Sequence, residues 1–302
     1  MDFKDLNYMV AIAKFQNITK AADSLCLTQP TLTKFLQNIE RDLGQKLFSR
    51  VGNKFVLTYA GECYLRKAKE MLALKKELDQ ELSDIINLNR GVLKIGFPAM
   101  RGAHMLPSTF PTFKKMYPNI LLNVIETNSI ELEELILNGE LDLAFFNLPI
   151  RRDGIDYQLL NSDEILFILG KEHPSIKYAV HRDDCKYPWL DFKYLKDIDF
   201  ILPALSQRTR QIVDKMFEEH KTLPNIALTT HNLHAAIELV AINYGGYFVS
   251  ETHLKHTGLQ DKVLCFSIGH PRNIVNFVAA YRRGAYISKY GQDYIDIVKQ
   301  SL

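Results

Sequence analysis

The amino-acid sequence indicates an α/β protein in which a small helical unit and one long helix precede two α/β lobes. Three patterns point to this fold. Short helical patterns with brief turns fill about the first 45 residues, and a proline-free helical pattern follows from about residue 59 to 89. From Gly91 strands and helices alternate, which is typical of a parallel sheet covered by helices. The expected domains are residues 1–60, 61–90 and 91–302.

The first unit is expected to hold three short helices, because apolar residues recur at spacings of three and four. Their apolar stripes are Phe3, Leu6, Met9, Val10 and Ala13; Ile18, Ala21, Ala22 and Leu25; and Leu32, Leu36, Ile39 and Leu43. Gly44 follows the third stripe in a favourable C-cap position. Short helices joined by brief turns indicate a helix-turn-helix unit.

A small hairpin or wing is expected next, where Gly52-Asn53 separates two segments rich in Val, Phe and Leu. The long helix after it would measure roughly 45 Å and cannot bury its apolar stripe alone. That stripe is Leu65, Ala68, Leu72, Leu74, Leu78, Leu82 and Ile85. Pairing with a second subunit is the first interpretation, and a helix folded back onto its own domain is the alternative.

From Gly91 onward the pattern predicts two series of strands and helices. The first has strands at 92–97, 120–126 and 141–146 with helices at 103–117 and 129–137. The second has strands at 164–170, 226–230 and 247–250 with helices at 207–220 and 232–243. A last strand at 275–281 and a helix at about 286–300 are expected to join the first sheet. The expected lobes are 91–162 with 267–302, and 163–266, the second covered by the aromatic segment 175–195.

Composition limits the class of protein. The net charge of the 302 residues is +2, yet residues 1–60 hold eight Lys/Arg against five Asp/Glu. Such an excess of positive charge is expected of a small nucleic-acid-binding domain joined to a neutral domain. With no apolar run of about 18 residues and no secretory signal, no membrane helix is expected. The widely spaced cysteines are expected to be free thiols in a reducing cytoplasm: Cys26, Cys63, Cys185 and Cys265.

The segment "CLTQPTLTKFL" opens the third helix. Thr28 can cap that helix and Pro30 fits its first turn, so both have structural explanations. Polar residues off the apolar stripe have no such structural explanation, and this helix holds no acid before Glu40. They are Thr31, Thr33, Lys34, Gln37 and Asn38. Such a surface suits phosphates and base edges, although an ordinary solvated face is the alternative.

These motifs resemble the N-terminal domain of LysR-type transcriptional regulators. The segment "TKAADSLCLTQPTLTKFLQNIERDLGQKLFSR" followed by "LTYAG" carries the family pattern, with Ile39-Glu40 in place of Leu-Glu. The matched positions are Thr19, Ala21, Ala22, Leu25, Thr28, Gln29, Pro30, Leu43, Gly44, Leu47, Phe48, Arg50, Leu57, Thr58 and Gly61. "YPNILLNVIE", "LILNGELDLAFF", "HPSI" and "VAINYGGYFVS" resemble the effector-binding domain of the same family.

The resemblance implies a winged helix-turn-helix, a linker helix that dimerises, and a two-lobed domain similar to periplasmic solute-binding proteins, usually assembled as a tetramer. It implies that the start of the third helix enters the major groove and that the wing meets phosphate. The expected DNA-binding residues are Thr28, Gln29, Pro30, Thr31, Thr33, Lys34, Arg50 and Lys54. Charge and polarity agree, since Lys and Arg add affinity and Gln29 can read adenine.

An effector is expected in the crevice between the lobes, where helix N-termini offer amides to an anion. The expected residues are Pro98, Ala99, Met100, Arg101, Asn147, Ser206, Gln207, Arg208, Thr209, His231, Asn232 and Phe248. Family members often place Ser or Thr in the first of these loops, which this chain lacks. Arg101 could bind a carboxylate or phosphate directly, or sit solvated at the rim.

The expected function is regulation of transcription in the cytoplasm. A dimer or tetramer would bind an inverted-repeat operator in double-stranded DNA, and an anionic effector would change DNA bending and contact with RNA polymerase. No enzyme, cofactor or metal is expected: no dinucleotide, phosphate-loop, G-x-S-x-G or H-E-x-x-H motif occurs, and His231 and His234 have no neighbouring ligands in the sequence.

Two alternatives remain open at this point. The chain could be a solute-binding or enzymatic α/β protein with an incidental helical extension. It could also be a regulator that senses oxidants through a thiol, because Arg182 and Lys186 lie near Cys185 and could lower the pKa of that thiol.

Overall fold

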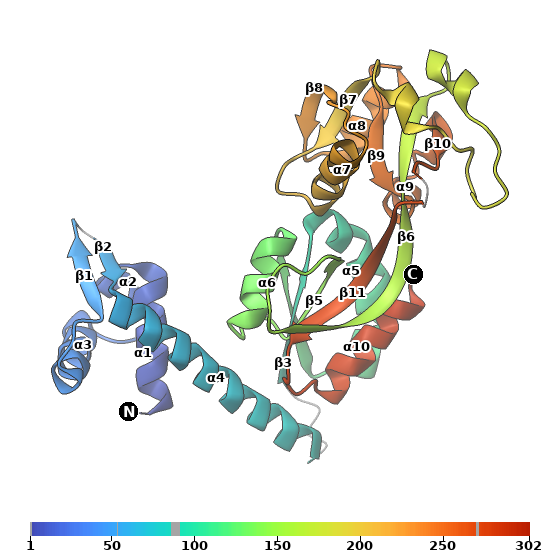
Figure 1. Ribbon diagram of the computed structural model, residues 1–302. Coiled ribbons are helices and arrows are strands. Elements are labelled where there is room, and N and C mark those ends of the chain that lie inside the picture. Colours follow the sequence, from blue (N-terminus) through green and yellow to red (C-terminus); the bar gives the residue numbers. More distant parts are fainter. Residues whose placement is uncertain (1, 53, 86–90, 270–271) are drawn as a thin grey trace.

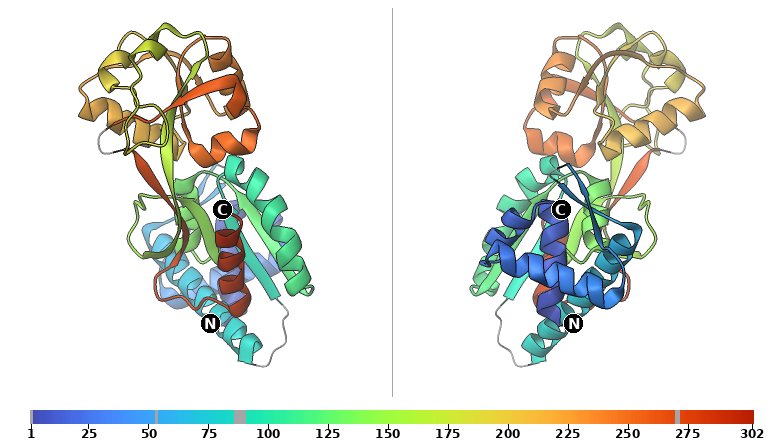
Figure 2. Two further views of the ribbon diagram at one scale, coloured as in Figure 1. Left: turned by 90° about the vertical axis from the view of Figure 1, so that its right-hand side faces the viewer. Right: turned by 90° about the vertical axis from the view of Figure 1, so that its left-hand side faces the viewer.

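The computed structural model describes residues 2–52, 54–85, 91–269 and 272–302 (Figure 1). A helical unit at the N-terminus leads through one long helix into two stacked α/β lobes (Figures 1 and 2). The expected turn residue Asn53, the side chain of Ile85 and residues 86–90 of the expected linker lie outside what is described.

The N-terminal unit consists of three helices and a two-stranded hairpin. They are α1 (Phe3–Phe15), α2 (Ile18–Ser24), α3 (Gln29–Leu43), β1 (Phe48–Val51) and β2 (Lys54–Leu57). As predicted, Thr28 caps α3 by accepting a hydrogen bond from the Thr31 amide, and Pro30 lies in the first turn. Gly44 ends the helix with φ +63°, a left-handed conformation that glycine adopts without strain.

The buried face of α1 differs from the predicted stripe. Leu6 and Met9 are buried as expected, but Phe3 is 47% exposed, and Tyr8 and Ile12 fill the core instead. Tyr8 is drawn inward because its ring packs edge-on against Phe35 of α3, with centroids 5.1 Å apart. The helix is therefore rotated relative to the face that simple spacing indicated.

The long helix α4 (Tyr59–Ile85) packs against α1 and then leaves the N-terminal unit (Figure 1). Ala68 is buried, but further along Leu74, Leu78 and Leu82 are 59%, 54% and 46% exposed. Together with Met71, 41% exposed, they form a stripe at spacings of three and four that this chain leaves uncovered. We call these four residues the α4 stripe.

Lobe I is a sheet of order β4–β3–β5–β11–β6 with helices on both faces. Its elements are β3 (Gly91–Phe97), α5 (Ala99–Met116), β4 (Ile120–Glu126), α6 (Ser129–Leu137), β5 (Leu143–Asn147), β11 (Ile274–Arg282) and α10 (Lys289–Gln300). The last strand and helix join this sheet as predicted. Helix α5 begins four residues before the predicted start, directly after β3, and continues through Pro107 and Pro111.

Two antiparallel strands, β11 and β6 (Ile155–Gly170), run from one lobe into the other (Figure 1). The sequence predicted only residues 164–170 of β6. Its first half was missed because exposed and half-buried side chains alternate there in a polar segment. The second half is fully buried and pairs with β9 (Tyr247–Ser250) and β10 (Val263–Phe266) of lobe II.

Lobe II surrounds this second half of β6. Its other elements are β7 (Asp199–Pro203), α7 (Arg208–Glu219), β8 (Asn225–Thr230), α8 (Leu233–Ala241), α9 (Glu251–Thr257) and 3-10 turns at Pro174–Tyr178, Phe192–Leu195 and Gln260–Lys262. β7, α9 and β10 were not predicted. The segment 175–195 packs on this lobe as predicted, since Leu190, Phe192 and Leu195 join its hydrophobic core.

Candidate DNA-binding surface and effector cavity

The start of α3 presents a polar, exposed surface. Thr28, Gln29, Pro30, Thr31 and Lys34 are exposed and Thr33 is half-buried. The Thr28 and Thr31 hydroxyls share a hydrogen bond of 2.8 Å, and Nε2 of Gln29 donates to Oγ1 of Thr33 at 2.9 Å. These contacts hold the side chains in one arrangement before any ligand arrives, which lowers the entropy cost of binding.

The role of Glu40 on the same helix was not predicted, although the residue belongs to the family pattern. It is only 7% exposed, and its Oε1 accepts the backbone amides of Leu47 at 2.9 Å and Phe48 at 3.2 Å. Its Oε2 binds Nζ of Lys46 at 2.7 Å. The acid is thus turned away from the exposed edge of α3, where it would repel phosphate, and it attaches the hairpin to the helix.

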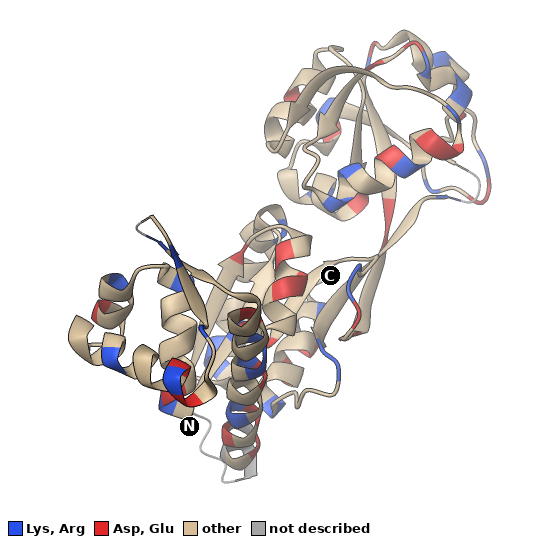
Figure 3. Ribbon diagram, turned by 60° about the vertical axis from the view of Figure 1, so that its left-hand side comes forward, with Lys and Arg blue, Asp and Glu red and all other residues tan. Residues whose placement is uncertain are grey.

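The hairpin carries Arg50 and Lys54, both exposed. Figure 3 shows Lys and Arg on the hairpin and on the helices of the N-terminal unit. The backbone N–H of Phe55 donates to the Gln16 carbonyl at 2.9 Å, which fixes the hairpin against the end of α1. A Cβ on Gly61 would lie 2.0 Å from the Leu47 carbonyl oxygen, so only glycine fits where α4 passes the hairpin.

A cavity of about 350 Å³ lies between the two lobes. Ten of the twelve residues predicted for the effector line it: Pro98, Ala99, Met100, Arg101, Asn147, Ser206, Gln207, Arg208, Thr209 and His231. Four further residues complete the lining: Thr127, Asn128, Ser129 and His253. The carboxyl ends of β3, β4 and β5 all meet at this cavity, because β3 lies between the other two and runs parallel to both.

Two predicted residues do not line the cavity. Phe248 is fully buried in the core of lobe II, where its ring packs against Phe167 and Phe217. Its position at a strand end suggested a site, but its side chain belongs to the hydrophobic core. Asn232 caps α8 by accepting the Ala235 amide and faces a neighbouring hollow.

Arg101 is not solvated at the rim, which corrects one of the two readings of this residue. It is 2% exposed, its guanidinium lies 3.9 Å from the centroid of the Phe277 ring, and Nη2 donates to Oδ1 of Asn147 at 3.4 Å. Burial lowers the pKa of Arg101 to about 10, although Asp163 offsets part of this effect. The group therefore remains a buried cation near neutral pH.

Arg208 crosses from lobe II to lobe I. Its Nη2 donates to Oε1 of Glu133 at 2.8 Å and its Nη1 to Gln211 at 3.1 Å, while Nε has no hydrogen-bond partner among the described residues. Burial lowers the pKa of Arg208, and Glu133 opposes this shift. The partner carboxylate compensates the charge, and the Nε–H remains an unused buried donor in the described part of the chain.

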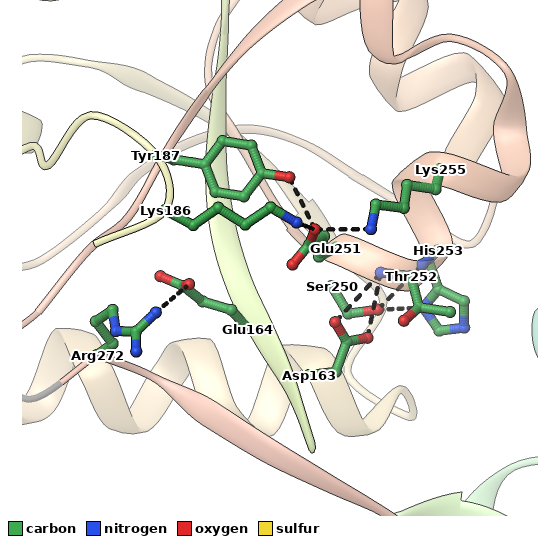
Figure 4. Close-up of polar contacts among 10 residues, drawn as sticks. All are labelled: Asp163, Glu164, Lys186, Tyr187, Ser250, Glu251, Thr252, His253, Lys255 and Arg272. Atoms are coloured by element: carbon green, nitrogen blue, oxygen red, sulfur yellow. Dashed lines mark hydrogen bonds and ion pairs between the residues drawn. The ribbon is translucent and has the colours of Figure 1, made fainter. Parts of the chain in front are cut away.

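His253 is a cavity residue that the sequence reasoning missed, because it belongs to the unpredicted helix α9. It is 9% exposed, shares a hydrogen bond of 2.9 Å with the Ser250 hydroxyl through Nδ1, and has no partner for Nε2 among the described residues (Figure 4). Burial and then the Arg101 charge lower its pKa well below the ordinary value, so the ring is neutral.

Helix N-termini add to the donors of the cavity. No side-chain hydrogen bond caps α5 or α7, whose first residues line the cavity. The start of α6 also lies at the cavity, but there the Asn128 side chain accepts the amides of Ile130 and Glu131. Free amides at helix N-termini favour anions.

Cys185 does not have the environment expected of a reactive thiol. Arg182 binds Asp184 instead, and Lys186 binds Glu251. Burial and the Asp184 carboxylate raise the pKa of Cys185, and burial raises the pKa of Cys265 to about 11. The expected lowering of the Cys185 pKa was therefore wrong, and the redox alternative loses its support.

The described residues hold neither a metal-binding cluster nor a helix that could span a membrane. No group of three His, Cys, Asp or Glu side chains there lies close enough to hold a metal ion. None of the described helices combines the length and the apolarity that crossing a membrane requires.

Comparison with known proteins defines the family. Residues 3–62 match "Bacterial regulatory helix-turn-helix protein, lysR family", and residues 87–302 match "LysR substrate binding domain". The chain is 26% identical over 312 residues to the uncharacterized HTH-type transcriptional regulator YcgK of Bacillus subtilis (strain 168), covering 100% of this chain and 95% of YcgK. It is 29% identical over 245 residues to the Hca operon transcriptional activator HcaR of Escherichia coli (strain K12), covering 81% of this chain and 80% of HcaR.

A full-length OxyR variant from Pseudomonas aeruginosa shares the fold, with a TM-score of 0.72 at 20% identity over 100% of this chain and 94% of OxyR. The two matched regions together span nearly the whole chain. The chain therefore belongs to the LysR family of DNA-binding transcriptional regulators, which carry an effector-binding domain and are not enzymes.

Proposed function

We propose that this regulator reads an operator with the exposed edge of α3 and its wing, and that a small oxyanion between the lobes controls the binding. The observation that carries the effector half is the cavity of about 350 Å³ with buried donors from both lobes. Arg101 comes from lobe I, whereas Arg208 comes from lobe II.

For DNA, the proposed contacts divide into two kinds. Gln29, held by Thr33, would read a base edge in the major groove, where an amide can bind adenine with two hydrogen bonds. Lys34, Arg50 and Lys54 would bind phosphates, which adds affinity but no sequence information. Thr28, Thr31 and Pro30 would shape the helix start that approaches the groove.

For the effector, the donors favour a carboxylate or a similar oxyanion. An unpaired N–H in a buried site costs about 1–3 kcal/mol, and a ligand oxygen would remove that cost at Nε of Arg208. Apolar groups of Pro98, Ala99 and Met100 share the lining, so an organic acid fits better than a bare inorganic ion.

Assembly would use the α4 stripe. LysR-type regulators are oligomeric, and Leu74, Leu78 and Leu82 leave an apolar seam that a second copy of α4 would cover. We propose a dimer through this helix, which can assemble further into a tetramer. The protein would act in the cytoplasm, where its operator and RNA polymerase are found, and would influence polymerase through the shape of the bound DNA.

Effector and DNA sites would communicate through α4. Its residues Lys69 and Lys76 bind Glu140 at 2.9 Å and Asp142 at 2.5 Å in lobe I, and Glu77 binds Arg282. A shift of lobe I on effector binding would thus move the helix that sets the spacing of the two DNA-binding units. This is an allosteric coupling with no chemical step.

A gel-shift titration tests the DNA half. Binding to operator fragments from the upstream region of the gene should weaken steeply with added salt, as expected when phosphate contacts release counterions. Absence of binding at every salt concentration would sink this half of the proposal.

A thermal-shift screen of the full chain tests the effector half. Carboxylates of increasing size, sulfate and phosphate should be compared with the neutral amides of the same acids. A bound anion should raise the melting temperature, and Arg101→Met should abolish the rise. Equal stabilisation by acids and amides would show that the cavity does not select anions.

A further inference from the structure

A second hollow of about 270 Å³ lies beside the effector cavity, and five of the nine histidines of the chain line it. They are His104, His231, His234, His253 and His256. Met100, His231 and His253 line both spaces, so the two are neighbours. We call these five residues the histidine hollow.

The histidine hollow lies where the two lobes touch. His104 comes from α5 of lobe I, and its ring stacks on that of His256 from α9 of lobe II, with centroids 4.2 Å apart and planes at 16°. The His253 ring, also from α9, lies edge-on at 5.6 Å from His104. On this side of the cavity imidazole rings therefore form much of the contact between α5 and α9.

One buried nitrogen on each of two rings is unused. Nε2 of His104 and Nε2 of His253 have no hydrogen-bond partner among the described residues. Because no three potential ligands there lie close enough to hold a metal ion, metal binding does not explain them. A proton is the ligand that these nitrogens can accept in this arrangement.

The charges around the rings oppose that proton. Arg101 on α5 and Lys255 on α9 are positive, while Asp163 on β6 is negative and accepts the backbone N–H of Thr252 through both oxygens, at 3.2 and 3.3 Å (Figure 4). From α8 and the turn before it, the exposed rings of His231 and His234 face the same hollow. Glu251 is occupied by Lys186 and Lys255.

The pKa values follow from these surroundings. Burial, His256 and Arg101 lower the pKa of His104 from 6.5 to about 4. Burial, Arg101 and Lys255 lower the pKa of His256. Separated lobes would expose both rings, so the separated arrangement binds more protons between pH 6.5 and about 4. The touching arrangement is thus favoured above pH 6.5 and is progressively lost as the pH falls below it.

The opposite side of the cavity is bridged differently. There Arg208 of α7 binds Glu133 of α6 at 2.8 Å, and Arg151 binds Gln211 at 2.9 Å. The two bridges use different helices: α9 meets α5 through His256 and His104, and α7 meets α6 through Arg208 and Glu133. If the histidine contact alone were released, the lobes could therefore rotate about the Arg208–Glu133 contact.

We propose that the contact of His104 with His253 and His256 is a proton-sensitive bridge between the lobes, closed when the rings are neutral and released when they are protonated. Combined with an effector in the adjacent cavity, as proposed above, this bridge makes effector response depend on pH. The bridge itself needs no effector, so it is tested without one.

Hydrogen exchange followed by mass spectrometry on the full chain provides the test, at pH 7.5 and pH 5.0 with intrinsic rates corrected. Amides in α5 and α9 should exchange faster at pH 5.0 than at pH 7.5. Their protection factors should fall on the order of ten-fold if one histidine has a different pKa in the two arrangements. Peptides from α3 and α10 should not show this loss. The His104→Gln, His256→Gln double variant should lose less protection between the two pH values than the unmodified chain, because only His253 of the three bridging rings can still titrate.

His220→Gln is the matched control, since this histidine stacks on Phe192 inside lobe II, with centroids 4.1 Å apart. This variant should lose protection in α5 and α9 at pH 5.0 to the same extent as the unmodified chain. If the double variant does not fold, the exposed His256→Gln alone should remove part of the loss. Unchanged protection at pH 5.0, or the same loss in the histidine variants, would overturn the bridge and leave the effector proposal standing.

Discussion

Glu133 and Arg208 join the two lobes through a buried ion pair. Oε1 of Glu133 accepts a hydrogen bond from Nη2 of Arg208 at 2.8 Å, and the two side chains are 0% and 5% exposed. The second oxygen of Glu133 accepts the backbone N–H of Arg151 at 3.0 Å. Both charges are compensated only while the lobes stay together, so this pair links the folding of the domain to the closure of its cavity.

Glu133→Ala should therefore destabilise the effector domain strongly. Removing one partner of a buried pair leaves the other charge uncompensated, which costs about 3–5 kcal/mol. Urea unfolding at neutral pH measures the loss. Glu219→Ala is the control, because its pair with Lys215 is 3.6 Å long and largely exposed, and should change stability by less than about 1 kcal/mol. Similar losses for the two variants would contradict the assigned role of the pair.

On DNA, Gln29→Ala should reduce discrimination between operator and random DNA. A lost two-bond contact to a base is expected to cost about 1–3 kcal/mol at the operator and little elsewhere. Lys54→Ala should weaken both complexes alike and lower the salt dependence, since a phosphate contact carries no sequence information. Fluorescence anisotropy at several salt concentrations separates these effects. Equal losses for both substitutions on both DNAs would refute the division of roles.

In the effector cavity, Arg101→Met should abolish the effector response and leave basal DNA binding unchanged. Methionine keeps the apolar contact with the Phe277 ring but removes the buried cation. Arg101→Lys is the matched variant, since it keeps the charge but not the planar contact with the ring, and should retain a weakened response. An unchanged dose–response curve for Arg101→Met would remove this residue from the site.

The sequence predicted those helices and strands whose local sequence pattern agrees with their packing in the folded chain. Thr28, Pro30 and Gly44 mark the ends of α3 through cap chemistry that acts within a few residues, and the structure has all three in these roles. The α/β lobes were predicted because buried strands such as β5 carry unbroken apolar runs. The tetramer and the operator contacts stay predictions.

What the sequence did not reveal depends on contacts between distant residues. Tyr8 is buried because Phe35 meets it from another helix, and Phe248 belongs to the core because of Phe167 and Phe217. His253 lies on a seven-residue helix with a polar sequence, so neither the helix nor its place in the cavity had a periodic signal.

Cys185 should react slowly with alkylating reagents. Burial and the neighbouring Asp184 raise the pKa of its thiol, so the reactive thiolate is a smaller fraction near neutral pH than for an ordinary cysteine, and the rate should keep rising as the pH increases above 8. Iodoacetamide labelling of the folded chain, resolved by peptide mass spectrometry, gives the rate for each cysteine.

The exposed Cys26 serves as the internal reference for this experiment. It should be labelled well before Cys185 at pH 7.5, and Asp184→Asn should speed labelling of Cys185 by removing the adjacent negative charge that the thiol faces at 3.7 Å. Labelling of Cys185 ahead of Cys26 would instead indicate an activated thiol, and would restore the oxidant-sensing alternative that the pairing of Arg182 with Asp184 argues against.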